Sequence, residues 1–206
     1  MRESMYRLVC FGDSICYGYG AFPGQGWVSR LANKFETLSR PIQVINSGIN
    51  GNTSEDGLMR MYQDVEQYGP QAVYIQFGLN DASTWWGPMP AVNLLQFIAN
   101  LGKMVERAQS CGAEKIFVAT NHPVGSFVPD IFDQYRRTVA EYNDKIRECL
   151  FSRENVIGVD IEKMALAECP NPDELVLSDG VHLSPEGNAF YCSVVSRILL
   201  AHLPEF

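Results

Sequence analysis

Two short segments far apart in the chain carry side chains suited to nucleophilic catalysis. Ser14 ends the run Phe-Gly-Asp-Ser, directly after an apolar stretch. Asp179 lies three residues before His182, and a glycine between them permits a tight turn. A carboxylate so placed can hold one imidazole nitrogen and leave the other free to take a proton from a hydroxyl. Each segment alone also fits a plain structural role, as a helix-capping serine or a surface turn.

Two further segments offer hydrogen-bond donors for a developing negative charge. Gly48 ends the run Asn-Ser-Gly, and Asn80 stands in the run Gly-Leu-Asn-Asp. A glycine lets its main-chain N–H approach a ligand closely, and a side-chain amide can donate another hydrogen bond. Each segment follows a predicted strand, so we expect both to emerge at one edge of a parallel sheet.

The chain contains three histidines, which restricts the choice of base. His122 follows the fourth predicted strand and is a rival to His182 by placement. His202 stands near the C-terminus in the last helical turn, where a capping or exposed role is expected. Asp13 and Asp81 are interpreted as turn residues whose carboxylates accept main-chain N–H bonds.

The elements that must position these residues follow from the hydrophobic pattern. Short apolar runs alternate with stretches of helical period, which is typical of a parallel sheet covered by helices. The predicted strands, all expected to be central, are 7–11, 43–46, 72–77, 115–120 and 156–159. The helical faces are predicted within 28–38, 58–68, 94–108, 135–146 and 190–198. We expect an α/β fold, a three-layer α/β/α sandwich whose five-stranded parallel sheet has the flavodoxin-like order 2-1-3-4-5, in a single domain over residues 1–206.

Aromatic residues on the predicted loops could contact a ligand. Glycine- and proline-rich segments at 18–26, 85–90 and 121–129 each follow a strand and should project from its carboxyl edge. The predicted substrate-binding residues are Tyr17, Trp85, Trp86 and His122. Aromatic rings at such positions could bind an acyl chain, an aryl group or a sugar face, or they could in part cover the core.

The segments around Ser14, Gly48, Asn80 and His182 together resemble the SGNH hydrolases, also described as GDSL-like lipases and acylhydrolases. They occur in that family's order and span almost the whole chain, although the first block reads Gly-Asp-Ser-Ile in place of Gly-Asp-Ser-Leu. The resemblance implies that Ser14 is the nucleophile, His182 the base and Asp179 its partner. It also implies an oxyanion hole formed by the N–H groups of Ser14 and Gly48 and the side chain of Asn80. A Gly-x-Ser-x-Gly elbow of the α/β-hydrolase type is absent around Ser14.

The expected function is that of a serine esterase that hydrolyses carboxylic esters through an acyl-serine intermediate. Small or medium acyl groups are favoured because the sequence has no apparent lid insertion or membrane-binding helix. The alternatives are a carbohydrate O-acetylesterase, a lysophospholipase- or thioesterase-type acylhydrolase, and transfer of the acyl group to another alcohol.

Other classes of function are less consistent with the sequence. A nucleotide-binding protein would need a complete Gly-x-Gly-x-x-Gly or Gly-Lys-Ser/Thr motif, which is missing. A metal hydrolase built on Asp13, Asp179 and His182 would lack a recognisable ligand spacing, so we expect neither metal nor cofactor. A catalytically inactive ligand-binding module would keep the same fold, but the complete set of catalytic residue types argues against it.

Composition narrows the partners and the compartment. Lysine and arginine number 16 against 24 acidic residues, for a net charge of -8, so nucleic acid and anionic membranes are not expected as partners. The apolar run near the N-terminus is too short for a signal peptide. The six cysteines are dispersed without a Cys-x-x-Cys pair and are interpreted as reduced thiols. We therefore expect a cytoplasmic protein that acts on a small-molecule ester, while its oligomeric state is left open.

Overall fold

A five-stranded parallel sheet forms the centre of the computed structural model, which describes residues 5–39, 41–84, 89–127 and 133–203. Its strands are β1 (Tyr6–Gly12), β2 (Ile42–Gly48), β3 (Ala72–Gln76), β4 (Lys115–Ala119) and β5 (Val156–Val159). The order across the sheet is β2-β1-β3-β4-β5, and every neighbouring pair is parallel. The predicted fold class and strand order are therefore confirmed.

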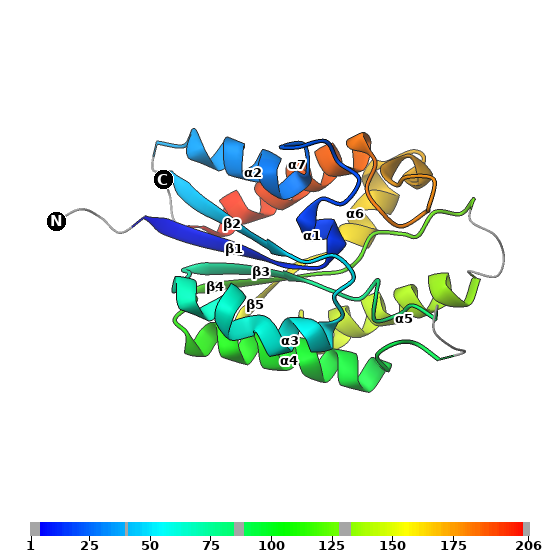
Figure 1. The fold of residues 1–206 in the computed structure, drawn as a ribbon, viewed down its shortest axis with the longest axis horizontal. Coiled ribbons are helices and arrows are strands. Elements are labelled where there is room, and N and C mark those ends of the chain that lie inside the picture. Colours follow the sequence, from blue (N-terminus) through cyan, green and yellow to red (C-terminus); the bar gives the residue numbers. More distant parts are fainter. Residues whose placement is uncertain (1–4, 40, 85–88, 128–132, 204–206) are drawn as a thin grey trace.

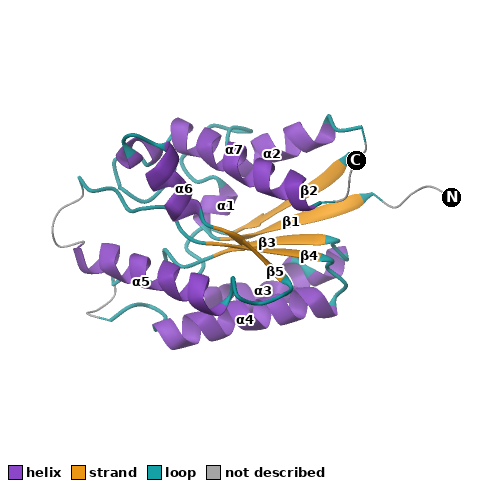
Figure 2. Cartoon of the chain, turned by 180° about the vertical axis from the view of Figure 1, so that it is seen from behind, coloured by secondary structure: helices purple, strands orange, loops and turns teal. Residues whose placement is uncertain are grey.

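Helices cover both faces of this sheet, which gives three layers (Figure 1). One face carries the short α1 (Ser14–Tyr17), α2 (Trp27–Glu36), α6 (Ile161–Glu168) and α7 (Pro185–His202). The other carries α3 (Ser54–Asp64), α4 (Leu94–Ser110) and α5 (Asp133–Cys149). Figure 2, which views the molecule from the opposite side, shows the same two helical layers on either side of the strands. Two short 3-10 helices, η1 (Glu66–Tyr68) and η3 (Pro172–Leu175), follow α3 and α6.

The strands differ in how completely they are buried. β1 and β3 are almost entirely buried, because helices cover both their faces and neighbouring strands pair with both their edges. β2 and β5 are the edges of the sheet and are partly exposed. The prediction that all five strands are central is wrong for these two, because apolar composition reports burial of the faces and not pairing of the edges.

The carboxyl edge of the sheet brings three loops to one level. Gly12 at the end of β1 stands in register with Gly48 of β2 and with Gln76 of β3. Ser14 lies just beyond Gly12, and Asn80 lies just beyond β3. Parallel pairing therefore delivers the segments that carry the candidate site to the same edge.

Some general chemical features can be stated for the described residues. Within them, no helix is both long and apolar enough to cross a membrane. In the same residues, no group of three or more histidine, cysteine, aspartate or glutamate side chains is arranged to hold a metal ion. All six cysteines are free thiols in the structure.

Candidate active site

Ser14 is the first residue of α1, the single helical turn that follows β1. Asp13 caps this turn, because its Oδ1 accepts the Ile15 N–H at 2.9 Å. The ring N–H of Trp27 donates to the Ile15 carbonyl oxygen at 2.8 Å and ties the turn to α2. Within the described residues, the main-chain N–H of Ser14 has no hydrogen-bond partner. Because α1 is only four residues long, its dipole is small, and this single N–H is what α1 offers to an anion.

His182 stands in a tight turn organised by one carboxylate. Asp179 Oδ1 accepts the main-chain N–H groups of Val181 and His182, both at 2.9 Å. Its Oδ2 lies 2.7 Å from His182 Nδ1, and His182 Nε2 lies 3.1 Å from Ser14 Oγ. The structure thus brings together three residues that are separated by up to 168 positions in the chain. These two contacts connect the Ser14 hydroxyl through the His182 ring to the Asp179 carboxylate.

The ionisation of Asp179 fits this geometry. Burial by itself would raise the pKa of Asp179, but hydrogen bonds from the His182 ring and from the Val181 and His182 N–H groups outweigh it and hold the pKa below 3.8. An ionised Asp179 keeps the His182 proton on Nδ1, so Nε2 is the acceptor that faces Ser14. The Tyr19 ring lies against the His182 ring, with centroids 4.3 Å apart, and restricts its rotation.

Gly48 does not present a free N–H, contrary to its predicted role as an oxyanion donor. Its N–H donates to Asn46 Oδ1 at 2.9 Å, while Asn46 Nδ2 donates to the Cys16 carbonyl oxygen at 2.8 Å. A Cβ atom on Gly48 would stand 2.1 Å from the Tyr17 nitrogen. Gly48 is therefore a glycine because β2 and α1 touch there, and its N–H is already used.

Asn80 and the loop before α3 supply other donors. Asn80 Nδ2 donates to the Asn52 carbonyl oxygen at 2.9 Å, which leaves one amide hydrogen for a ligand. Gly51 precedes Asn52, has φ +77°, and has open space where a Cβ would stand. Among the described residues its N–H has no hydrogen-bond partner. The sequence interpretation missed Gly51, although it lies in the same glycine- and asparagine-rich segment as Gly48.

Asp13 and Asp81 are both buried carboxylates. Burial is the largest effect on each and raises the pKa of Asp13 to about 7 and that of Asp81 to about 6. Asp81 accepts the Ser54 N–H at 2.9 Å and the Ser54 hydroxyl at 2.5 Å, so it joins the loop after β3 to the start of α3. The interpretation of Asp13 as a turn residue agrees with its hydrogen bond to Ile15, whereas Asp81 binds a segment 27 residues away and does not cap its own turn.

Arg60 on α3 is a residue of the site that the sequence interpretation missed. Its guanidinium donates to the carbonyl oxygens of Gly12 and Ser47 and to the side chains of Asn52 and Asp64. It therefore ties the ends of β1 and β2 to the loop that carries Asn52. The signal in the sequence was that Arg60 is the single basic residue of α3, which is otherwise an amphipathic helix with acidic and apolar residues.

His122 is fully buried and does not face a ligand. Its Nδ1 lies 2.7 Å from the Tyr191 hydroxyl and its Nε2 2.7 Å from the Val181 carbonyl oxygen. Burial lowers the pKa of His122 to about 4, which keeps the ring neutral. The predicted substrate contact of His122 is contradicted by this burial, and its candidacy as the base fails because neither ring nitrogen is available.

Of the other three predicted substrate-binding residues, the structure describes Tyr17 alone. Tyr17 is 55 % exposed and lies on α1 with Ser14. Trp85 and Trp86 lie outside the described residues. A cavity of about 470 Å³ borders the turn that carries His182, and its lining includes Phe22 and Leu183. The remaining lining residues are Gly20, Ala21, Gln25, Arg30, Leu177, Pro185 and Asn188.

Comparison with known proteins gives a consistent result. The family model described as GDSL-like Lipase/Acylhydrolase family matches residues 10–190. The chain is 27 % identical over 203 residues to an arylesterase from Vibrio mimicus, which covers 98 % of this chain and 92 % of that protein. A lipase/acylhydrolase from Enterococcus faecalis superimposes with a TM-score of 0.80 at 27 % identity over 98 % of this chain and 99 % of that one. An acetyl-xylooligosaccharide esterase from Geobacillus stearothermophilus gives a TM-score of 0.77 at 25 % identity over 94 % of each chain.

Proposed function

We propose that this chain, which belongs to the GDSL-like lipase/acylhydrolase family, hydrolyses esters of small to medium acyl groups through an acyl intermediate on Ser14. Membership of this family makes it a carboxylic ester hydrolase of the serine esterase type. The observation that carries the assignment to these residues is the path from Ser14 Oγ through His182 to Asp179, at 3.1 and 2.7 Å.

The first half of the reaction forms the acyl-enzyme. Ser14 Oγ attacks the ester carbonyl carbon while its proton passes to His182 Nε2. Asp179 stabilises the resulting imidazolium. The tetrahedral intermediate then breaks its bond to the alcohol oxygen, which leaves with the proton from His182. In the second half, water attacks the acyl carbon, His182 takes the water proton, and the acid departs as the proton returns to Ser14 Oγ.

The negative charge on the tetrahedral oxygen requires donors that are free before substrate binds. We assign this role to the main-chain N–H of Ser14, the side chain of Asn80 and the main-chain N–H of Gly51. Gly51 replaces Gly48 in this set because the Gly48 N–H is bound to Asn46, whereas that of Gly51 is unpaired among the described residues.

The donor set can be tested by nuclear magnetic resonance of the phosphonylated enzyme, whose phosphoryl oxygen occupies the oxyanion position. The amide proton of Gly51 should shift downfield by more than that of Gly48 when the adduct forms, because a new hydrogen bond deshields it. A larger shift at Gly48 would restore the original assignment and remove Gly51.

The nucleophile can be identified with a fluorophosphonate probe. We expect one adduct, located on Ser14 by peptide mass spectrometry, and loss of both adduct and turnover in Ser14→Ala. Ser83→Ala is the matched control, because Ser83 is another buried serine at the same sheet edge and should keep both. Full turnover in a folded Ser14→Ala would refute the proposal.

Support for small to medium acyl groups comes from the cavity of about 470 Å³ lined by Leu177 and Leu183, which flank the turn that carries His182, since pockets of roughly this size hold small-molecule ligands. A series of p-nitrophenyl esters from acetate to palmitate should show kcat/KM highest at the short end. Highest activity on palmitate would overturn the size preference.

A cytoplasmic location stays a prediction from the sequence.

A second candidate function is removal of acetyl groups from carbohydrates. The similarity to the Geobacillus acetyl-xylooligosaccharide esterase favours it. Acetate release from acetylated xylo-oligosaccharides, compared with p-nitrophenyl acetate at equal enzyme concentration, distinguishes the two. A kcat/KM that is higher on the oligosaccharide would make deacetylation the main activity.

A further inference from the structure

A chain of buried hydrogen bonds connects the core of the sheet to the turn that carries His182. It begins with the Tyr74 hydroxyl, 3.2 Å from Gln76 Oε1 on β3. Gln76 Nε2 donates to the Tyr191 hydroxyl on α7 at 3.0 Å, and that hydroxyl lies 2.7 Å from His122 Nδ1. His122 Nε2 lies 2.7 Å from the carbonyl oxygen of Val181. All four side chains are completely buried.

The last acceptor fixes the direction of every hydrogen bond near His122. A carbonyl oxygen can only accept, so His122 must carry its proton on Nε2 and donate it to Val181. A neutral ring then has an unprotonated Nδ1, which accepts the proton of the Tyr191 hydroxyl. The Tyr191 oxygen is left to accept from Gln76. Both tyrosine hydroxyls and the His122 ring N–H thus each donate one hydrogen bond, which is the arrangement that stabilises buried polar groups.

The contact made by His122 restrains one particular peptide group. The carbonyl of Val181 and the N–H of His182 belong to the same planar unit. The carbonyl oxygen is held by His122 Nε2, and the N–H is held by Asp179 Oδ1 at 2.9 Å. Hydrogen bonds at both ends restrain the rotation of this peptide plane, which in turn restrains the backbone from which the His182 side chain extends toward Ser14.

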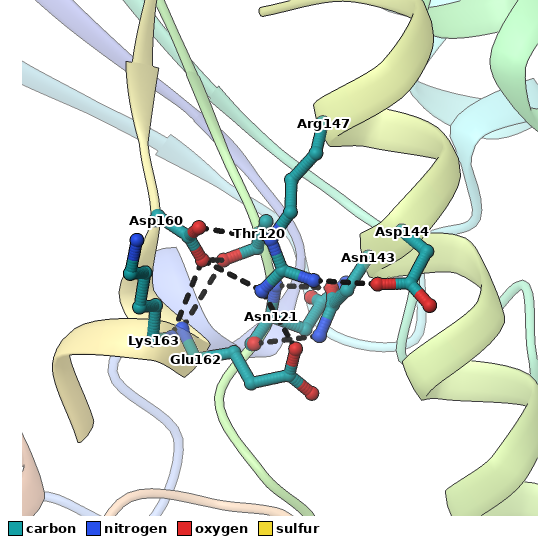
Figure 3. Close-up of polar contacts among 8 residues, drawn as sticks. All are labelled: Thr120, Asn121, Asn143, Asp144, Arg147, Asp160, Glu162 and Lys163. Carbon is teal, nitrogen blue, oxygen red and sulfur yellow. Dashed lines mark hydrogen bonds and ion pairs between the residues drawn. The ribbon is translucent and has the colours of Figure 1, made fainter. Parts of the chain in front are cut away.

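The backbone before His122 is itself fixed (Figure 3). Asn143 on α5 accepts the Asn121 N–H at 2.8 Å and donates to the Asn121 carbonyl oxygen at 3.0 Å, as a neighbouring strand would. Arg147 holds both carboxylate oxygens of Asp160, at 2.8 and 2.7 Å, and Asp160 accepts the Thr120 hydroxyl at 3.2 Å. His122 therefore projects from a rigid segment at the end of β4.

We propose that His122 is a positioning residue of the esterase: its ring N–H holds the Val181 carbonyl oxygen and so aims His182 at Ser14. The proposal rests on the proposed role of His182 as the base. It explains why a histidine with no access to substrate occupies a buried position beside this turn. The neighbouring segment adds a second contact of the same kind, since the Gly125 N–H donates to the Gly180 carbonyl oxygen at 2.8 Å.

Two amide variants that differ by one methylene test this role. His122→Gln can place a donor near the former Nε2 and an acceptor toward Tyr191, whereas His122→Asn is too short to reach Val181. We expect His122→Gln to keep kcat within about threefold of the wild type and His122→Asn to lose about 10- to 100-fold, because a small misplacement of a catalytic group has effects of this size. KM for p-nitrophenyl acetate should stay within about twofold in both, because the substrate contacts are unchanged.

Tyr142→Phe is the control for a purely structural loss. The Tyr142 hydroxyl donates to the Val92 carbonyl oxygen, so this variant also removes a buried hydrogen bond to a loop, but away from His182. Its kcat should match the wild type. All variants are assayed at a temperature where circular dichroism shows them folded.

Equal kcat values in His122→Gln and His122→Asn, or a loss of kcat in Tyr142→Phe as large as in His122→Asn, would overturn the proposal. The proposed function fails in a different way, namely if Ser14→Ala still turns over the ester. An inactive Ser14→Ala together with a fully active, folded His122→Asn would remove only the positioning role.

Discussion

Replacing Asp13 by asparagine would isolate the cost of burying an ionisable carboxyl beside the nucleophile. Asp13 is completely buried, and its Oδ2 has no hydrogen-bond partner within the described residues. Burial, opposed by the hydrogen bond from Ile15, raises its pKa from 3.8 to about 7. The folded protein therefore holds a proton that the unfolded chain releases between those two values. Stability falls as the pH rises through this window, because the unfolded state then binds fewer protons than the folded one.

The magnitude follows from the two pKa values of Asp13. One pKa unit corresponds to about 1.36 kcal/mol, so burial of Asp13 lowers the free energy of unfolding by about 2 kcal/mol at pH 5 and by about 4 kcal/mol at pH 8. Asparagine does not ionise and has no such dependence. The free energy of unfolding of Asp13→Asn relative to the wild type should therefore rise by about 2–3 kcal/mol between pH 5 and pH 8. A buried amide without an acceptor costs about 1–3 kcal/mol, but this cost is the same at both pH values and cancels.

The assay is urea unfolding of both proteins at pH 5 and pH 8, followed by tryptophan fluorescence. The surface control is Asp144→Asn, whose side chain is 75 % exposed and has little desolvation to relieve. Its stability relative to the wild type should change far less between the two pH values. A stability difference between Asp13→Asn and the wild type that is equal at pH 5 and pH 8 would refute the reasoning, since it would mean that Asp13 ionises alike in both states.

Three further substitutions test separate parts of the site. Asn80→Ala should lower kcat on p-nitrophenyl acetate by about 10²–10³ with little change in KM, and a loss below tenfold would exclude Asn80 from the oxyanion hole. Asp179→Asn should lower kcat by about 10⁴ at neutral pH in a folded protein, because the amide favours the wrong tautomer of His182; retained activity would argue against the pairing. Gly48→Ala should destabilise by about 1–3 kcal/mol or more in thermal unfolding, because its Cβ would stand 2.1 Å from the Tyr17 nitrogen. Gly51→Ala should cost only about 1 kcal/mol of backbone strain, and the opposite ranking would contradict the packing described for Gly48.

Much of the fold follows from local pattern. Apolar runs at β1 and β3 and the helical stripes of α4 and α5 report which faces are buried, and alternation of strands with helices leaves few parallel topologies. The positions of Ser14 and His182 were also predictable, since each stands in a short run whose residue types have a specific chemical use. The one-domain organisation stays a prediction.

Hydrogen-bond partners could not be predicted in the same way. Gly48 and Gly51 look alike in sequence, yet the first is pressed against α1 with its N–H bound and the second has an open N–H. Arg60 resembles any surface arginine until the ends of β1 and β2 are seen to meet at its guanidinium. The sequence correctly placed His122 at the carboxyl edge of the sheet. It did not show that His122 is buried there against Tyr191 of α7.

The sequence by itself determined the order of strands and helices, the acid–base and nucleophilic residue types, and the sheet edge at which they emerge. These depend on composition and periodicity along the chain. Only the tertiary structure decided which N–H groups are free, which histidine faces Ser14 and which one holds the turn behind it. The physical reason is that a hydrogen bond is satisfied or left open by atoms from distant segments, such as Asn46 for Gly48 or Tyr191 for His122, and no local pattern records their distance.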